Sequence, residues 1–468
     1  MWNFRKYKNK TALITENNEY KFNDIKKFSE KLKKKIKKKN LILILCENSI
    51  ECILGYLGFF INNQTILFVD LNTEKNLLGK IIKKYSPDFI WAPKTKKKNF
   101  NKKYTSHFDY LSYCLFKIKK KNHILINDNL CLLVPTSGSM GSPKLVKQTY
   151  KNIKENTNSI LKYLKIKESD KTIMNLPLSY TYGISIINTH LKVGSPIVIT
   201  KYTILQKKFW KLFELNKISV LNGVPYTYEI LDKLNFFKNY KKNLKIITQA
   251  GGKLPDNLQK KINSYCLKYN TKFYIMYGQS EATTRISFLP FRKNKVKIGS
   301  IGKPIHKGKI FLKDRLGNII NKPNLIGKIF YTGPNVCSGY SYNRADLNKE
   351  DKWKGIIDTG DLGKKDSEGY YYITGREKRI SKIYGHSLNL DEIELMIKNY
   401  LNENDIAVRG NDKFIYIYYS KKKIINKLKK FIFKKIKINS IVFNFKYLKK
   451  IPKLVSGKIN YKKLYINN

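Results

Sequence analysis

A loop of small, hydroxyl-bearing residues that ends in a lysine has the chemistry to bind phosphate groups. It follows an apolar run, 131–134, and consists of Thr136, Ser137, Gly138, Ser139, Met140, Gly141, Ser142, Pro143 and Lys144. Glycine lets backbone N–H groups approach a polyphosphate, hydroxyls add donors, and Lys144 brings a point charge. The pattern G-x-x-x-x-G-K-[ST] does not fit, because Pro143 takes its second glycine position and Leu145 follows the lysine. A Ser/Gly-rich turn without a ligand is the alternative interpretation of the loop alone.

Four further motifs follow this loop along the chain: Tyr277-Gly278-Gln279-Ser280-Glu281, Asp358-Thr359-Gly360-Asp361, Gly375-Arg376-Glu377-Lys378 and Pro452-Lys453-Leu454-Val455-Ser456-Gly457-Lys458-Ile459. The five motifs, in this order, resemble those of the AMP-forming adenylating enzymes. This superfamily includes acyl-CoA synthetases, peptide-synthetase adenylation domains and beetle luciferases. Residues 48–57 are also similar to the helix after the family's first core strand, so the resemblance covers nearly the whole chain.

The resemblance implies which residues of these motifs bind phosphate, bind metal and take part in catalysis. Adenylation of a carboxylate requires in-line attack on the α-phosphate of ATP, and positioned cations and donors stabilise the developing charge. Lys144 and its loop are expected to grip the β- and γ-phosphates, Ser280 to bind the α-phosphate, and Glu281 to hold Mg²⁺, which prefers hard carboxylate oxygens. The catalytic residues implied are Lys458, Glu281, Ser280 and Lys144. Glu281 is the implied metal ligand.

The resemblance also implies the residues that bind the nucleotide and the thiol cofactor. Tyr277 is expected to stack on the adenine, and Asp361 and Arg376 to bind the ribose hydroxyls. Lys458 is expected to enter the site from the C-terminal domain for adenylation and to leave when that domain rotates for thioester formation. The complete implied set for cofactor binding is Thr136, Ser137, Gly138, Ser139, Gly141, Lys144, Gly251, Gly252, Tyr277, Gly278, Ser280, Asp361, Arg376, Lys382 and Gly385.

Four positions depart from the family pattern. Met140 stands where Thr or Ser is usual and removes one phosphate donor, and Leu145 replaces a glycine. Lys253 follows the glycine pair where an acidic residue or Ala is frequent, and Tyr180 stands where the family often has His. None of these changes removes the phosphate cation, the metal carboxylate or the ribose pair.

The elements that must position these motifs are predicted by alternating patterns. Apolar, β-rich runs occur at 41–45, 65–71, 88–91, 131–134, 172–176, 197–200, 218–221, 245–247 and 273–276. Segments of helical periodicity lie between them, such as Leu77, Leu78, Ile81 and Ile82. This alternation predicts an α/β fold with mostly parallel sheets covered by helices, with site residues at strand ends. The Lys-rich segment 31–39 predicts a basic helix with one buried edge.

A length of 468 residues predicts two or three domains. The resemblance implies a large N-terminal domain, 1–376, and a small, mobile α+β C-terminal domain, 377–468, with a hinge near Lys378. In the latter, Ile424, Ile425, Leu428, Phe431 and Ile432 predict an amphipathic helix. We expect its apolar face to pack in the small domain, with a membrane surface as the alternative.

The formal net charge of +59 would ordinarily suggest nucleic acid or an anionic membrane as a partner. The lysines are instead spread over nearly every segment, which predicts solvated surface and no specific nucleic-acid binding. Arginine is scarce and cannot be replaced by Lys at a bidentate site. It occurs at Arg5, Arg285, Arg292, Arg315, Arg344, Arg376, Arg379 and Arg409.

Cysteine spacing and hydropathy predict the compartment. The cysteines show no C-x-x-C pair and lie mostly in apolar runs, which predicts buried free thiols in a reducing environment. The first ten residues lack an apolar signal core, and the longest apolar stretch, 52–61, is far shorter than the roughly 20 residues that span a bilayer. We therefore expect a cytoplasmic protein without a transmembrane segment.

The function predicted from the sequence is an ATP-dependent acid–thiol ligase that forms acyl-AMP and passes the acyl group to CoA or to the phosphopantetheine of an acyl carrier protein. Segment 178–183 has no carboxylate to hold an α-ammonium group, which predicts a fatty, hydroxylated or aromatic acid as substrate. Its rings and hydroxyls suit an uncharged acyl group. The alternatives are a stand-alone amino-acid adenylation enzyme and, in another class, a non-catalytic or nucleic-acid-binding relative.

Overall fold

The computed structural model describes residues 1–100, 104–119, 124–135, 144–240, 244–383, 386–411, 413–436, 438–454 and 457–464. Several predicted cofactor-binding residues lie outside these ranges, namely Thr136, Ser137, Gly138, Ser139, Gly141 and Gly385.

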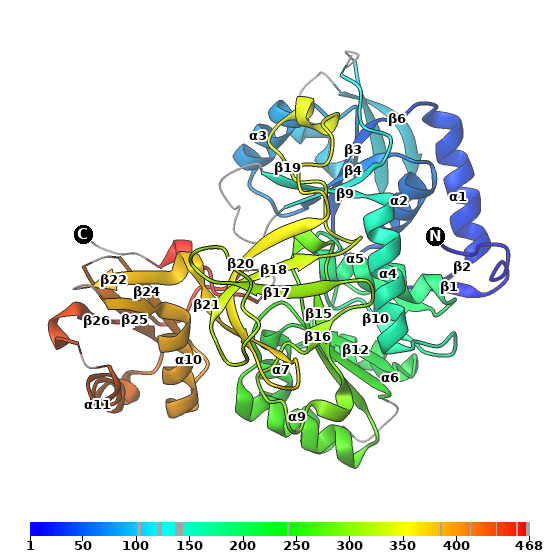
Figure 1. Cartoon of the computed structure of the whole chain (residues 1–468). Helices are drawn as coiled ribbons and strands as arrows, with labels where there is room; N and C mark the ends of the chain where they lie inside the picture. Colours follow the sequence, from blue (N-terminus) through cyan, green and yellow to red (C-terminus); the bar gives the residue numbers. More distant parts are fainter. Residues whose placement is uncertain are drawn as a thin grey trace.

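Two large mixed sheets form the body of the molecule (Figure 1). The first has the strand order β19(Tyr340–Ser341), β9(Leu145–Thr149), β8(Leu130–Pro135), β4(Thr65–Asp70), β3(Leu41–Cys46), β5(Phe89–Pro93), β7(Tyr113–Ile118), β6(Tyr104–Tyr110). The second has the order β16(Lys303–Pro304), β15(Ser287–Leu289), β14(Lys272–Tyr277), β13(Ile246–Gln249), β12(Val220–Gly223), β10(Thr172–Ile173), β11(Ile197–Val198), β1(Thr11–Ile14), β2(Glu19–Lys21). The central strands of both sheets are parallel and the edges antiparallel.

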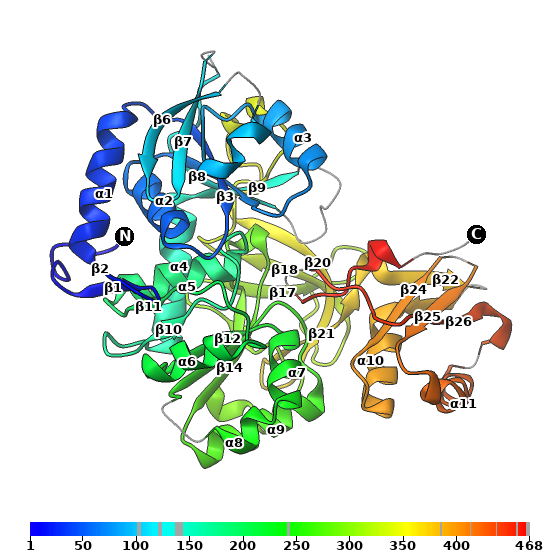
Figure 2. The same ribbon diagram turned by 180° about the vertical axis from the view of Figure 1, so that it is seen from behind.

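Helices cover both sheets. They are α1(Phe22–Lys35), α2(Ile50–Ile61), α3(Lys75–Tyr85), α4(Tyr150–Leu164), α5(Thr181–Lys192), α6(Lys207–Leu215), α7(Pro225–Lys233), α8(Phe236–Asn239) and α9(Asp256–Lys268). Alternate residues of β3 belong to two different cores: Ile42 and Ile44 pack with α1, α2, α4 and α5, while Leu41 and Leu43 pack with α3. Burial of both faces explains why this strand is apolar throughout. Helices α6 to α9 cover the outer face of the second sheet (Figure 2).

A third, antiparallel sheet leads from the body to the C-terminal elements. Its strands are β17(Lys309–Lys313), β18(Gly327–Thr332), β20(Ile356–Lys365) and β21(Tyr371–Arg376). After it come β22(Ile380–Ile383), β23(His386–Asn389), α10(Leu390–Leu401), β24(Ile406–Gly410), β25(Ile415–Tyr419), α11(Ile425–Lys435) and β26(Phe443–Tyr447). These elements lie to one side of the large sheets and share a separate apolar core (Figure 1).

The predicted α/β fold is confirmed. All the predicted apolar runs coincide with strands of the two large sheets, although β10 and β11 are shorter than expected. The amphipathic pattern near residue 430 forms α11, whose Leu428 and Ile432 are buried in the C-terminal core. The prediction for 31–39 was wrong at its end, because α1 stops at Lys35. The next residue, Ile36, is extended, and its side chain packs in the main core.

The described residues contain no helix that is both long and apolar enough to cross a membrane. Each cysteine is free and buried, as the sequence predicted.

Candidate active site

The motif 277–281 lies where strand β14 ends. Strand β14 carries Tyr277, and the chain then turns tightly through Gly278 into a short 3-10 turn, Ser280–Ala282. A Cβ atom on Gly278 would lie 1.9 Å from the backbone oxygen of Thr284, so only glycine permits this return of the chain. Two contacts hold the turn against its neighbours: Gln148 Nε2 donates to the Ser280 carbonyl at 3.0 Å, and the Cys337 N–H donates to the Glu281 carbonyl at 2.9 Å.

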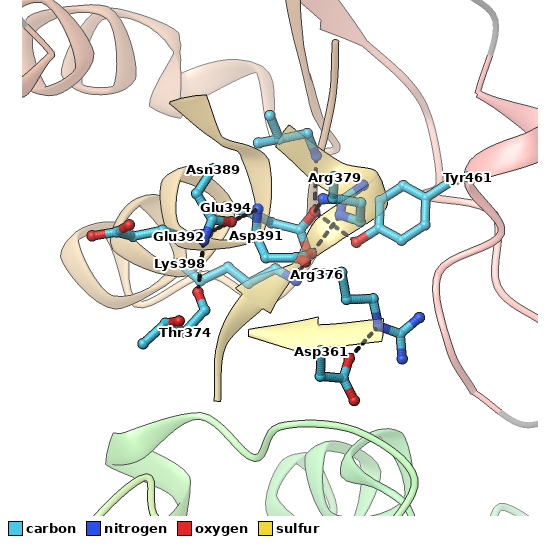
Figure 3. Close-up of polar contacts among 11 residues, drawn as sticks. Asp361, Thr374, Arg376, Arg379, Asn389, Asp391, Glu392, Glu394, Lys398 and Tyr461 are labelled. Carbon is cyan, nitrogen blue, oxygen red and sulfur yellow. Dashed lines mark hydrogen bonds and ion pairs between the residues drawn. The ribbon is translucent and has the colours of Figure 1, made fainter. Parts of the chain in front are cut away.

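Asp361 joins this motif to the third sheet. Its carboxylate is 5% exposed and accepts hydrogen bonds from Tyr277 Oη at 2.5 Å and from Arg376 Nε at 3.1 Å. Asp361 and Arg376 are directly paired across strands β20 and β21, so backbone pairing holds the two charges together (Figure 3). Burial, followed by the Asp361 carboxylate, raises the pKa of Tyr277, which therefore remains a neutral donor.

Lys144 and Glu281 approach each other through Tyr340. The Lys144 ammonium lies 3.3 Å from the centroid of the Tyr340 ring, and Tyr340 Oη donates to Glu281 Oε1 at 2.9 Å. Pairing of β9 with β19 brings the tyrosine beside the lysine, because Tyr340 is opposite Val146. The phosphate-loop cation and the predicted metal carboxylate therefore belong to one cluster.

Lys458 reaches this cluster from the C-terminal part of the chain. Arg376, Asp361 and Glu281 lie close enough for their charges to act on its ammonium group. Burial and, to a smaller extent, the charge of Arg376 lower the pKa of Lys458 to about 8, while the two carboxylates oppose the shift. A tight turn carries the residue: the Leu454 N–H donates to the Lys458 carbonyl at 2.7 Å, and Gly457 has a φ of +79°.

The same turn packs against the body of the molecule. A Cβ atom on Gly457 would lie 2.7 Å from Tyr226 Cβ, at the start of α7. Lys453 Nζ lies 3.0 Å from Asp405 of the C-terminal elements, 3.5 Å from Glu229 of α7, and 4.4 Å from the Tyr226 ring centroid. Lys453 therefore bridges the two parts of the structure.

These contacts bring together residues from several of the predicted motifs, and the comparisons decide the family. The AMP-binding enzyme family matches residues 2–341. This chain belongs to that family. The predicted superfamily is thereby confirmed.

Curated relatives of this AMP-binding enzyme include two CoA ligases and a gramicidin S synthase. The 2-succinylbenzoate–CoA ligase of Oceanobacillus iheyensis is 28% identical over 284 residues, which are 61% of this chain and 57% of that ligase. The 2-succinylbenzoate–CoA ligase of Listeria monocytogenes is 25% identical over 478 residues, covering 97% of this chain and 96% of the ligase. Gramicidin S synthase 2 of Brevibacillus brevis is 25% identical over 97% of this chain and 11% of the synthase.

Solved structures share the fold. O-succinylbenzoate coenzyme A synthetase from Bacillus subtilis in complex with AMP has a TM-score of 0.79 at 20% identity, covering 99% of this chain and 97% of that one. ATP-bound MatB from Rhodopseudomonas palustris has a TM-score of 0.78 at 18% identity, covering 97% and 95%. The synthetase from Bacillus subtilis is also known in complex with ATP and a magnesium ion.

Other residues predicted for this AMP-binding enzyme lie beside the cluster or outside the described part. Gly251 follows β13 with a φ of +89°, and a Cβ there would lie 2.6 Å from Tyr180 Oη. Gly252 is the next residue, and a Cβ there would lie 3.2 Å from Pro225 Cγ. Lys382 belongs to strand β22, but its side chain is outside the described part of the structure.

Sequence reasoning missed three residues of the site region. Tyr340 links Lys144 to Glu281, and no motif marks it. Tyr461 stacks on the Arg379 guanidinium at 4.0 Å and donates to Glu394 Oε2 at 2.8 Å (Figure 3). Arg285 lies four residues beyond Glu281 and is buried. The scarcity of arginine in a Lys-rich chain was a signal that could have identified Arg285.

Proposed function

We propose that this AMP-binding enzyme is an ATP-dependent acid–CoA ligase, which forms an acyl-adenylate and pyrophosphate and then transfers the acyl group to the thiol of CoA. The observation that carries the proposal is geometric: Asp361 binds Tyr277 and Arg376, Tyr340 links Lys144 to Glu281, and Lys458 is buried within range of the charges of both groups. It unites a cation, a metal-type carboxylate and a ribose-type pair from distant segments. The full-length match to a 2-succinylbenzoate–CoA ligase supports the CoA acceptor.

The residues have the chemistry that adenylation requires. Lys458 and Lys144 supply positive charge where the α-phosphate gains charge and pyrophosphate leaves. Ser280 has no side-chain hydrogen bond among the described residues, so its hydroxyl is available as a donor. Asp361 and Arg376 would hold the ribose, and Tyr277 would orient the adenine.

Glu281 fits Mg²⁺, which would neutralise phosphate charge when bound. Mg²⁺ keeps several waters and usually takes only one or two carboxylates together with substrate phosphates. Tyr340 occupies Oε1 of Glu281, and no hydrogen bond to Oε2 occurs within the described segments. The described residues also contain no group of three His, Cys, Asp or Glu side chains that could hold a metal ion. A magnesium ion at Glu281 would therefore need water or phosphate oxygens as its other ligands.

The second half-reaction rests on a two-domain arrangement. Residues 1–376 would form the adenylation domain and residues 377–468 a lid that turns about Lys378. Lys382 and Gly385, just beyond this hinge, are proposed to bind the cofactor together with the phosphate loop 136–141 and the glycine pair 251–252. The separate core of the C-terminal elements and their polar contacts with α7 support a unit that moves as a body.

Pyrophosphate release with a panel of acids tests the function. The panel contains 2-succinylbenzoate, other aromatic acids, fatty acids and α-amino acids, each with ATP, Mg²⁺ and CoA. We expect release with at least one acid that is not an amino acid, and the matching acyl-CoA by mass spectrometry. Glu281→Gln should abolish release, whereas the exposed Glu30→Gln should not.

The other outcomes separate the alternatives. Pyrophosphate release with α-amino acids alone would favour amino-acid adenylation. The match to Gramicidin S synthase 2 is the reason to test this alternative. ATP binding without pyrophosphate release from any acid would show a non-catalytic relative.

A further inference from the structure

Arg285 is a buried cation without an acidic partner. Its residue is 3% exposed, and it follows the motif that contains Glu281. The guanidinium donates from Nη1 to the Thr284 carbonyl and from Nε to the Met276 sulfur, each at 3.3 Å. It also lies 4.1 Å from the centroid of the Tyr182 ring.

Three other arginines pair with carboxylates, whereas the half-buried Arg409 donates to the backbone carbonyls of Tyr461 and Leu464. Arg344 Nη2 lies 2.9 Å from Asp88, Arg376 pairs with Asp361, and Arg379 pairs with Asp391 and Glu394. Among the residues that the structure describes, no Asp or Glu forms an ion pair with Arg285. A guanidinium has five donors and keeps its charge at any physiological pH, so its burial beside neutral groups is unfavourable. An anionic ligand would remove this cost.

Contacts connect Arg285 to the segment expected to bind the acyl group. Thr284 Oγ1 donates to the carbonyl of Thr181, the first residue of α5. Tyr182, whose ring meets the guanidinium, packs edge-to-face on Tyr180 with centroids 6.4 Å apart. Tyr180 in turn lies over Gly251.

Tyr180 and Tyr182 differ in how firmly their rings are held. Its hydroxyl forms no hydrogen bond with the described residues, whereas Tyr182 Oη is hydrogen-bonded to Thr248. Displacing the Tyr180 ring would therefore break no hydrogen bond with the described residues, whereas displacing the Tyr182 ring would break its bond to Thr248.

We propose that Arg285 binds a second carboxylate at the far end of the acyl substrate, so that this enzyme selects dicarboxylic acids. The inference rests on the proposed function and replaces the sequence-based expectation of an uncharged acyl group. Segment 178–183 lacks a charge of its own, but the structure places a cation directly behind it. One carboxylate would be adenylated beside Lys458 and the other would pair with Arg285.

Matched acids that differ by one carboxylate test this proposal. 2-Succinylbenzoate is compared with 4-oxo-4-phenylbutanoate, which lacks the ring carboxylate, and hexanedioate with hexanoate. The readout is the kcat/KM for pyrophosphate release. We expect the preferred diacid to exceed its monoacid by on the order of a hundredfold, as for a buried charge pair.

Variants assign that preference to Arg285. Arg285→Gln should reduce the diacid-to-monoacid ratio to near one, Arg285→Lys should retain part of it, and the exposed Arg292→Gln should leave it unchanged. The melting temperature with and without ATP checks the fold. If Arg285→Gln does not fold, the proposal is judged from the diacid-to-monoacid ratios of the wild type and of Arg285→Lys.

Two results would overturn the assignment while the ligase function stands: equal use of monoacid and diacid by the wild type, or an unchanged ratio in Arg285→Gln. Failure of the proposed function looks different, because no carboxylic acid of the panel would then release pyrophosphate, and the assignment would fall with it.

Discussion

At the scale of single residues, Lys458 has a charge that depends on pH near neutrality. Burial lowers its pKa to about 8, so the ammonium is present below that pH and is lost above it. The loss removes the cation that we assign to the transition state of adenylation.

We therefore expect the kcat/KM of ATP in the adenylation half-reaction to fall as pH rises through about 8, because this parameter reports the pKa of the free enzyme. Pyrophosphate exchange measured from pH 6 to 10 checks this. In Lys458→Arg the fall should move to higher pH, since guanidinium does not titrate in this range. An identical fall in that variant would assign the titration to another group.

Removal of the cation should separate the two half-reactions. Lys458→Ala should lower acyl-adenylate formation by on the order of a hundredfold or more, the effect expected for one charge-assisted contact to the transition state. Thioester formation from supplied acyl-adenylate should be largely spared. Lys462→Ala removes an exposed lysine four residues away and is the control. Equal losses in both half-reactions would rule out a role for Lys458 in adenylation alone.

At the scale of elements, the segment after β21 holds the turn that carries Lys458. Arg379 pairs with Asp391 and Glu394, and the Tyr461 ring covers its guanidinium (Figure 3). Glu394 also accepts from the Val408 N–H at 2.9 Å, which ties the cluster to β24. Tyr461 follows Lys458 by three residues, so this cluster fixes the base of the Lys458 turn.

Graded substitutions of Tyr461 test this support. Tyr461→Phe keeps the ring on Arg379 and loses the bond to Glu394, so adenylation should fall by up to about tenfold. Tyr461→Ala loses both contacts and should have the larger effect. Adenylation is measured by ATP–pyrophosphate exchange, with the exposed Tyr447→Ala as control. A loss in melting temperature alone, with exchange unchanged, would leave Tyr461 with a purely structural role.

The same scale shows what the sequence could predict. Strands such as β3 and β4 were found because burial on both faces makes every residue apolar. The pairing of Asp361 with Arg376 needed only the two motifs. By contrast, Tyr340 contacts Lys144, and Arg285 contacts Tyr182, only because the fold brings distant segments together. No local sequence pattern encodes such contacts. The end of α1 was missed because Ile36 is buried without being helical.

At the scale of the whole molecule, the C-terminal elements lie against α7. Lys453 forms a charged bridge between them, with Glu229 on one side and Asp405 on the other. Thiol transfer requires these contacts to break if the lid turns about Lys378.

Lys378→Pro tests that turn. Proline fixes φ near −65° and should hold one arrangement of the lid, so adenylation should survive while thioester formation falls steeply. Lys378→Ala leaves the backbone free and is the control. The two half-reactions are measured separately, by pyrophosphate exchange and by acyl-CoA yield. Unchanged overall turnover of the proline variant would place the hinge elsewhere.

The position of Lys458 also makes nucleotide affinity and lid closure reciprocal. If ATP binds more tightly when Lys458 is in the site, then bound ATP must stabilise closure, and with it the Lys453–Glu229 contact, by the same factor. Loosening that distant ion pair should therefore weaken ATP binding without touching any residue that contacts the nucleotide. The Lys453–Glu229 contact and the ATP site are therefore thermodynamically coupled, although no residue belongs to both.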